Sequence, residues 1–137
     1  MAGTRSGGLQ AWGITFLRVV VGLVFVMHGG QKLFISGFPN VAGMMRQLGV
    51  PLPMGFAVVV TFVEFFGGIA LVLGIFVRSA AFLIAFDMLV AVLLVHLHAG
   101  FFLPRGFEYA LTLLAASVML ALTGPGAAAL SVRRVKH

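Results

Sequence analysis

Cysteine is absent from this chain of 137 residues. Without a thiol, the chain can form no disulfide, carry out no thiol–disulfide exchange and bind no iron–sulfur cluster or metal through thiolates. A redox role would therefore need an electron carrier from elsewhere, such as a quinone, a haem or a partner subunit.

Acidic residues are almost as scarce. The chain has only three, Glu64, Asp87 and Glu108, and each lies inside or at the edge of a long apolar run. Hydrocarbon disfavours a charged carboxylate, so such residues tend to face a bundle interior, to pair with a cation or to mark a site. We therefore expect an internal polar core. The same runs also hold Arg18, His28, Lys32, His96 and His98.

Charged residues of any kind are few. They make up 9% of the chain, hydrophobic residues make up 61%, and the mean hydropathy is +1.17. Because a soluble domain is about a quarter charged, the composition predicts an integral membrane protein. The formal net charge is +6, but the basic residues lie at the ends of apolar runs and not on one solvated face. This favours contact with anionic lipid headgroups over nucleic acid.

The apolar runs predict an all-α fold, a four-helix membrane bundle that forms one domain over residues 1–137. Each run approaches the roughly 20 apolar residues that a spanning helix needs. Val77-Arg78-Ser79 is the expected tight link between the second and third helices, and Gly124-Pro125-Gly126 is expected to end the fourth. Residues 127–137 form a basic tail. The expected spans are residues 12–34, 54–77, 79–98 and 107–123.

The loop charges predict the orientation. With four spans both termini lie on one side, which carries five basic residues against three on the other. The positive-inside rule then places both termini in the cytoplasm, in the cytoplasmic (inner) membrane.

Residues 35–53 are expected to include a short amphipathic helix at the outer interface. Apolar residues recur there at helical spacing, with Asn40 as the expected N-cap and Gly49 as the stop. A packed connector is the simpler interpretation, and a lid over a cavity between the helices is the functional one.

In each span the ionisable residues share a face with small residues, which mark close helix packing in lipid. The ionisable groups should therefore face one another. Depth along the helices predicts that Arg18 pairs with Asp87, and that Lys32 or Arg105 pairs with Glu108. Glu64 could bond His28, Arg18 or a protonated partner. An ideal helix turns His96 away from Asp87, unless the helix unwinds before Gly100.

Each group has a structural and a functional interpretation. Arg18 and Asp87 could be an ion pair that holds helices together, or part of a substrate or proton site. Glu64 lies near the midplane, where nothing obvious requires a carboxylate, so a ligand or proton site is as plausible as a structural role. The histidines could contact a quinone headgroup, whereas a bis-histidine haem is disfavoured. His96-Leu97-His98 lacks a third metal ligand, so no metal site is expected.

Several short motifs resemble those of the DoxX family. They are Phe16-Leu17-Arg18 and the run His28-Gly29-Gly30-Gln31-Lys32 in the first span, Glu64-Phe65-Phe66-Gly67-Gly68 in the second, Val95-His96-Leu97 at the end of the third, and Glu108-Tyr109-Ala110-Leu111 in the fourth. Their order and spacing are specific together, and the resemblance runs from about residue 12 to residue 126.

The resemblance implies a four-helix bundle in the cytoplasmic membrane and a link to quinone-coupled oxidoreductases. Relatives include subunits of a terminal quinol oxidase and of a thiosulfate:quinone oxidoreductase, and others act as assembly or stress-response partners of membrane proteins. Asp87 and His98 are less typical of the family than the remaining ionisable positions. Those positions are Arg18, His28, Lys32, Glu64, His96 and Glu108.

The leading hypothesis is a membrane subunit of a quinone-linked respiratory or redox complex, whose buried polar site contacts a quinone or relays protons. Glu64, with His28 and Arg18, would line the cavity, while Lys32, His96 and Glu108 would shape its outer mouth. We expect no catalysis by the chain alone, and membrane lipids together with partner subunits or further copies of the chain as its partners. Two alternatives stay open: a non-catalytic accessory or assembly protein, and a carrier of protons or small solutes.

Overall fold

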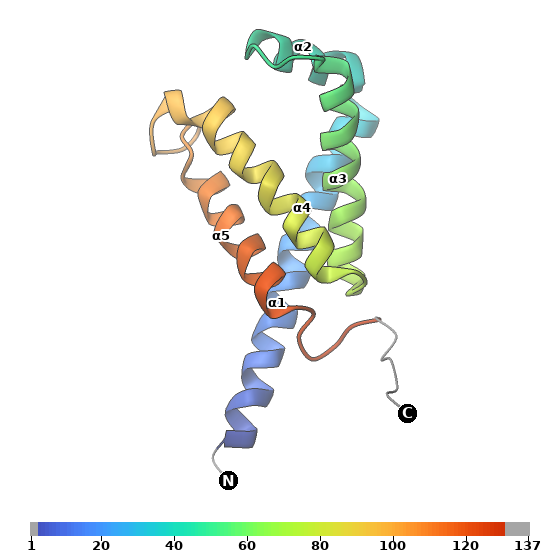
Figure 1. The fold of residues 1–137 in the computed structure, drawn as a ribbon, viewed down its shortest axis with the longest axis vertical. Coiled ribbons are helices and arrows are strands. Elements are labelled where there is room, and N and C mark those ends of the chain that lie inside the picture. The colour runs from blue at the N-terminus through green and yellow to red at the C-terminus, as the bar shows by residue number, and fades with distance from the viewer. Residues whose placement is uncertain (1–2, 131–137) are drawn as a thin grey trace.

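The computed structural model describes residues 3–130, with side chains from Gly7 onward, and this part of the chain is helical without strands. The charges of the predicted basic tail, Arg133, Arg134 and Lys136, lie outside the described residues. Figure 1 shows the arrangement. The elements are α1 (Gly3–Gly30) continued by π-helical η1 (Gln31–Ser36), α2 (Phe38–Gln47), α3 (Pro53–Leu73), α4 (Val77–Val90) continued by π-helical η2 (Ala91–His96) and 3₁₀ η3 (Leu97–Ala99), and α5 (Glu108–Thr123).

Within residues 3–130, three helical stretches are long and apolar enough to cross a membrane, namely Gly7–Ser36, Pro53–Leu73 and Val77–Ala99. The apolar helix α5 has 16 residues and is about 24 Å long, which is shorter than a typical hydrocarbon core. Together, the three long apolar stretches and the shorter α5 confirm the predicted helical membrane bundle. The first helix begins earlier than expected, because α1 already starts at Gly3.

The link between α3 and α4 lies a few residues before its predicted place. Gly74 adopts a left-handed conformation (φ 76°, ψ 38°) and ends α3, and Phe76 also has a positive φ of 46°. Glycine takes this conformation without the Cβ clash that other residues suffer, which is why it ends helices so often. The prediction that Val77-Arg78-Ser79 forms the link was wrong, because these three residues open α4.

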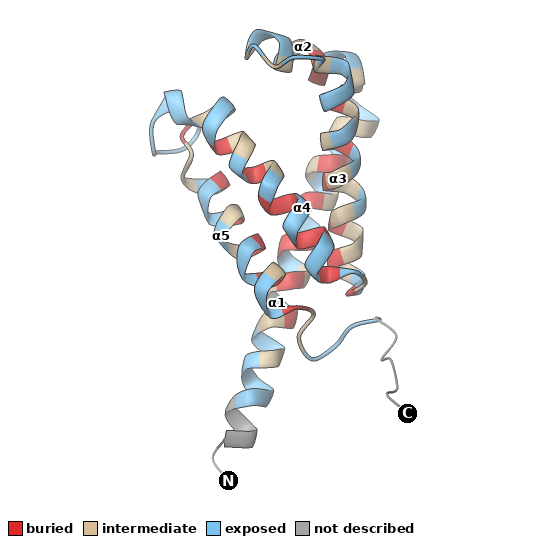
Figure 2. Cartoon of the chain, in the orientation of Figure 1, coloured by how far each residue is buried: buried red, intermediate tan, exposed pale blue. Residues whose placement is uncertain are grey.

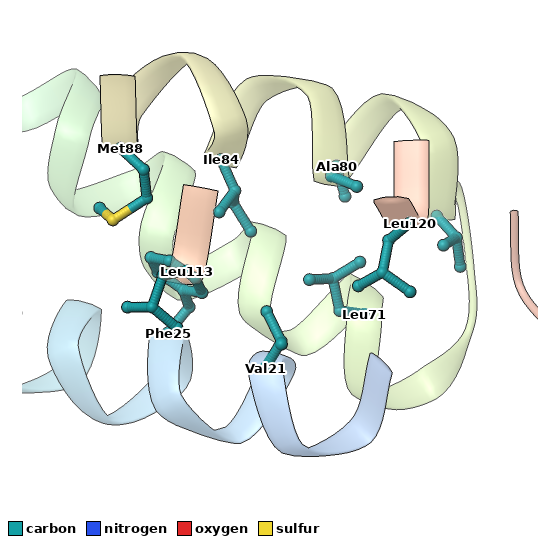
Figure 3. Close-up of a cluster of buried hydrophobic side chains, with 10 residues drawn as sticks. Val21, Phe25, Leu71, Ala80, Ile84, Met88, Leu113 and Leu120 are labelled. Atoms are coloured by element: carbon teal, nitrogen blue, oxygen red, sulfur yellow. The ribbon is translucent and has the colours of Figure 1, made fainter. Parts of the chain in front are cut away.

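The helices form two pairs. α1 packs most extensively on α3, and α4 packs on α5. Figure 1 shows that the pairs meet near the α3–α4 link and diverge toward the end that carries α2. A cluster of buried apolar side chains joins them where they meet, including Phe25 of α1, Leu71 of α3, Ile84 of α4 and Leu120 of α5 (Figure 3). Most buried residues lie on sides that face other helices, and the outward faces are exposed as lipid contact requires (Figure 2).

Glycines set the close approach of α1 to α3. A Cβ added to Gly68 would lie 2.6 Å from the backbone nitrogen of Val26 and 2.8 Å from the carbonyl oxygen of Gly22, and one added to Gly29 would overlap the backbone of Phe65. Only residues without a side chain fit at these positions. The predicted role of small residues in helix packing is thus confirmed for this pair.

The short helix α2 caps the α1–α3 pair at one end of the molecule (Figure 1). Its Val41 and Ala42 are buried against Ala57 of α3. Gly49, with a φ of 77°, follows the helix as predicted. The predicted N-cap was wrong, because α2 already begins at Phe38, and the Asn40 side chain donates a hydrogen bond to the Ser36 carbonyl (2.7 Å).

We predict that Gly68→Ala destabilises the bundle, because the new methyl group meets backbone atoms of α1 that cannot move independently. Overpacking of this kind costs about 1–3 kcal/mol, so the thermal midpoint of the purified protein in mild detergent should fall clearly. Gly55→Ala is the matched control within α3, since a Cβ there has no atom within 4 Å. Equal midpoints for the two variants would contradict this account of the α1–α3 contact.

Candidate functional site

A cavity of about 560 Å³ lies between the two helix pairs, on the side where they diverge. Its walls come from α1, η1, α3, α4, η2 and α5. The helix α2 with the loop after it, and the loop before α5, complete the lining. Most of its surface is apolar, with Met45, Phe56, Val60, Phe86, Leu94 and Leu113 among the lining residues. The polar lining residues are His28, Lys32, Glu64, Asp87, His96 and Tyr109.

An ion pair crosses from the first helix to the second in this wall. The Lys32 ammonium of η1 contacts Oε2 of Glu64 in the middle of α3. Glu64 is only 3% exposed. A buried carboxylate without a cation is costly in an apolar environment, so the nearby Lys32 ammonium stabilises the charged form of Glu64. The prediction that Lys32 or Arg105 pairs with Glu108 was therefore wrong, because Lys32–Glu64 is the ion pair that forms among the described residues. Neither His28 nor Arg18 bonds Glu64.

Asp87 of α4 is the second carboxylate of the cavity. It lies close enough to Glu64 and to Lys32 for electrostatic interaction. Its Oδ2 is buried and has no hydrogen-bond partner within residues 3–130. The cavity thus gathers two carboxylates around one ammonium.

The predicted Arg18–Asp87 pair was wrong, because Arg18 bonds a backbone carbonyl instead and the one ion pair in the described part of the chain is Lys32–Glu64. The guanidinium is 2% exposed, and its Nη1 donates to the Pro125 carbonyl at 2.5 Å. Thr15, one turn earlier, accepts hydrogen bonds from the backbone N–H groups of Ala127 (2.8 Å) and Ala128 (3.3 Å). Arg18 therefore fastens the segment after α5 to α1 and does not line the cavity.

The two neighbouring histidines of the third span have different surroundings. The helix widens to a π-helix over Ala91–His96, and this extra width turns His96 toward the same cavity as Asp87. Its Nδ1 lies 3.0 Å from the Arg105 carbonyl oxygen. His98, two residues on, is exposed and is not part of the cavity wall. The unwinding that the sequence left open does occur.

Of the two remaining candidates, one lines the cavity and the other does not. His28 lines the cavity and packs edge-on against Phe25 and Tyr109, with ring centroids 6.4 and 6.5 Å apart. Glu108 lies outside it, in the first turn of α5 and beside a separate surface depression. Five of the eight candidates therefore share one cavity, and three do not. The five are His28, Lys32, Glu64, Asp87 and His96.

Sequence reasoning missed Tyr109. It is the only tyrosine of the chain, and it lies on the face of α5 that also carries Ala110 and Leu113 toward the cavity. A polar aromatic residue at this point of an apolar helix was the available signal. Among residues 3–130, no group of three or more histidine, aspartate or glutamate side chains could hold a metal ion.

Known proteins resemble the chain over most of its length. The model of the DoxX family matches residues 13–97. "Putative oxidoreductase CatD" of Bacillus subtilis is 34% identical over 113 residues, which cover 82% of this chain and 79% of that protein. The inner membrane proteins YphA and YqjF of Escherichia coli are each 32% identical, over 85% and 87% of this chain and 86% and 89% of their own lengths. No solved structure gives a significant match.

We predict that Lys32→Met destabilises the protein more than Lys32→Met combined with Glu64→Gln. The single change leaves a buried carboxylate without its cation, which typically costs about 3 kcal/mol or more, and the second change removes that charge. Thermal unfolding in detergent measures the difference. Arg46→Met, at an exposed position of α2, is the control for loss of a cation. A double variant no more stable than the single one would show that the pair contributes no charge compensation.

Proposed function

The chain belongs to the DoxX family, and we propose that it is a membrane subunit of a quinone-linked redox system whose cavity receives a quinone headgroup. The observation that supports this most directly is the combination of an apolar cavity with polar groups at membrane depth. The cavity wall holds the Lys32–Glu64 pair together with Asp87, His28 and His96.

The residues of the cavity fit such a ligand. A quinone has an apolar ring and tail and two polar oxygens at the ring edge, so it needs an apolar pocket with a few well-placed polar groups. A volume of about 560 Å³ lies within the usual range for small-molecule sites, about 300–1,000 Å³. The polar lining residues His28, Lys32, Glu64, Asp87 and His96 supply the few polar groups that such a ligand needs.

A quinone, when bound, supplies two-electron and two-proton redox chemistry. The chain's own residues would hold the ring between α3 and α4 and exchange protons at the carboxyl oxygens of Glu64 and Asp87. Lys32 would keep Glu64 oriented from η1. Because the chain has no cysteine, the electrons would come from a partner subunit, and the name "Putative oxidoreductase CatD" of one relative is compatible with such a role.

An accessory or assembly role is the main alternative, and Asp87 argues against it. The Lys32–Glu64 pair would be enough to join α1 to α3 in a purely structural bundle. A second carboxylate beside it adds repulsion and an unsatisfied oxygen, both of which cost stability. Groups of this kind persist mainly where a ligand or proton uses them.

We place this subunit in the cytoplasmic membrane with both termini in the cytoplasm. The two Escherichia coli relatives are named inner membrane proteins, and the basic residues favour this orientation. The cavity then opens toward the outer half of the membrane, where lipids, partner subunits or a second copy of the chain would border it.

We predict that Glu64→Gln lowers the quinone content of the protein purified natively in mild detergent, while the complex still assembles. The amide cannot pair with Lys32 as a carboxylate does, so the wall of the headgroup site changes. Lipid extraction and mass spectrometry measure the bound quinone, and native gels measure assembly. Glu108→Gln makes the same chemical change outside the cavity and should retain the wild-type quinone content.

Other outcomes would identify the alternatives. Wild-type protein that carries no quinone, with both variants assembling normally, would contradict the proposal and favour an accessory role. Flux of protons or solutes in liposomes that contain only this protein would favour a carrier.

A further inference from the structure

Two of the side chains that line the cavity also belong to the outer surface of the bundle. Phe56 of α3 is 46% exposed and Phe86 of α4 is 62% exposed, and both line the cavity. A side chain with so much accessible surface is not enclosed, so the cavity meets the outer surface beside it. The cavity therefore has a lateral opening between α3 and α4, on the side where the two helix pairs diverge (Figure 1).

This lateral opening lies at the depth of the hydrocarbon core. Phe86 follows Val77, the first residue of α4, by nine positions, which corresponds to about 14 Å along the helix axis. A hydrocarbon core is about 30 Å thick, and α4 begins at one end of the bundle (Figure 1), so Phe86 lies near the middle of the core. The molecules next to the opening are therefore the acyl chains of lipids.

The exposed part of the cavity lining is apolar. Every lining residue that is exposed has an apolar or aromatic side chain, as Leu94 of η2 and Leu103 of the loop before α5 illustrate together with the two phenylalanines. The five ionisable lining residues are buried or half-buried. Water or an ion would find no polar partner at such an entrance, whereas a hydrocarbon chain passes from one apolar surface to another.

The polar groups farther inside are largely engaged by the protein itself. The Lys32 ammonium contacts the Glu64 carboxylate, and Asp87 lies beside this pair with its Oδ2 buried. His96 has the Arg105 carbonyl oxygen 3.0 Å from its Nδ1. Most of the surface that remains for an occupant of the cavity is therefore apolar.

An apolar cavity of about 560 Å³ beside fluid hydrocarbon is not expected to stay empty. Its wall atoms would lack van der Waals partners on one side, and water would find few of the polar partners that it needs, so such a cavity takes up apolar molecules. A lipid tail is as apolar as a leucine side chain. Its entry from the bilayer therefore costs little in solvation and gains packing contacts with the wall.

We propose that an acyl chain of a membrane lipid occupies the cavity through the lateral opening between α3 and α4 when no other ligand is bound. This inference goes beyond the proposed function, because it concerns how the cavity is reached and what fills it in the resting protein. A ligand that replaces the acyl chain arrives from the membrane, and its apolar tail follows the same path.

The first test uses the unmodified protein in bilayers that contain a phosphatidylcholine with a carbene-generating diazirine near the end of one acyl chain. Leu113 and Leu120 of α5 are both buried, but only Leu113 lines the cavity. After irradiation we expect lipid adducts on Leu113 and few or none on Leu120. Adducts on the exposed Leu111 measure labelling by the lipid around the bundle. Tandem mass spectrometry locates the adducts.

The second test narrows the cavity. Val60 of α3 lines the cavity, whereas its neighbour Val59 is exposed and is not part of the wall. Val60→Trp should lower the adducts on Leu113 severalfold relative to those on Leu111, because the indole ring takes the space of the chain. Val59→Trp adds the same ring on the lipid-facing side and should leave this ratio unchanged.

Adducts on Leu111 without adducts on Leu113 would overturn the proposal, and so would equal labelling of Leu113 and Leu120. A decyl-tailed benzoquinone added before irradiation separates this inference from the proposed function. A loss of adducts on Leu113 alone would support both, because the two molecules would then compete for one cavity. Labelling of Leu113 that the quinone does not change would support the acyl chain as occupant and contradict the quinone as ligand.

Discussion

The cost of a charged group in hydrocarbon governs this structure. Glu64 is held near the middle of α3 by Lys32, a residue at the far end of the first span, and this contact requires α1 and α3 to approach closely. Gly22, Gly29 and Gly68 permit that approach because any side chain there would meet backbone. The ion pair therefore depends on the glycines, because the close packing that they permit brings the Lys32 ammonium within reach of the Glu64 carboxylate.

Much of the fold follows from the sequence, because the length of an apolar run and the demand for internal hydrogen bonds allow few choices in a membrane. Helix number, order and the small-residue contacts of α1 with α3 were predicted. Boundaries were less accurate, and for a local reason. Gly74 ends α3 through a left-handed turn, yet the apolar run continues past it, so hydropathy alone places the link too late.

The candidate site could be predicted only in part. The residue types were found, but their partners were assigned from depth on regular helices, and two π-helical segments, Gln31–Ser36 and Ala91–His96, change the direction of Lys32 and His96. Arg18 illustrates another limit. Its partner is the backbone carbonyl of Pro125, 107 residues further along the chain. A pattern of charges in a sequence cannot predict an uncharged backbone acceptor.

The attachment of residues 124–130 to α1 also bears on biosynthesis. Arg18 and Thr15 are synthesised well before their hydrogen-bond partners, because the carbonyl of Pro125 and the amide of Ala127 lie 107 and 112 residues further along the chain. Until Pro125 has been synthesised, a guanidinium within an apolar helix must rely on water or lipid phosphate. The first helix can therefore settle at its final depth only after the fourth span has been inserted, so the bundle is completed after all four helices have been made.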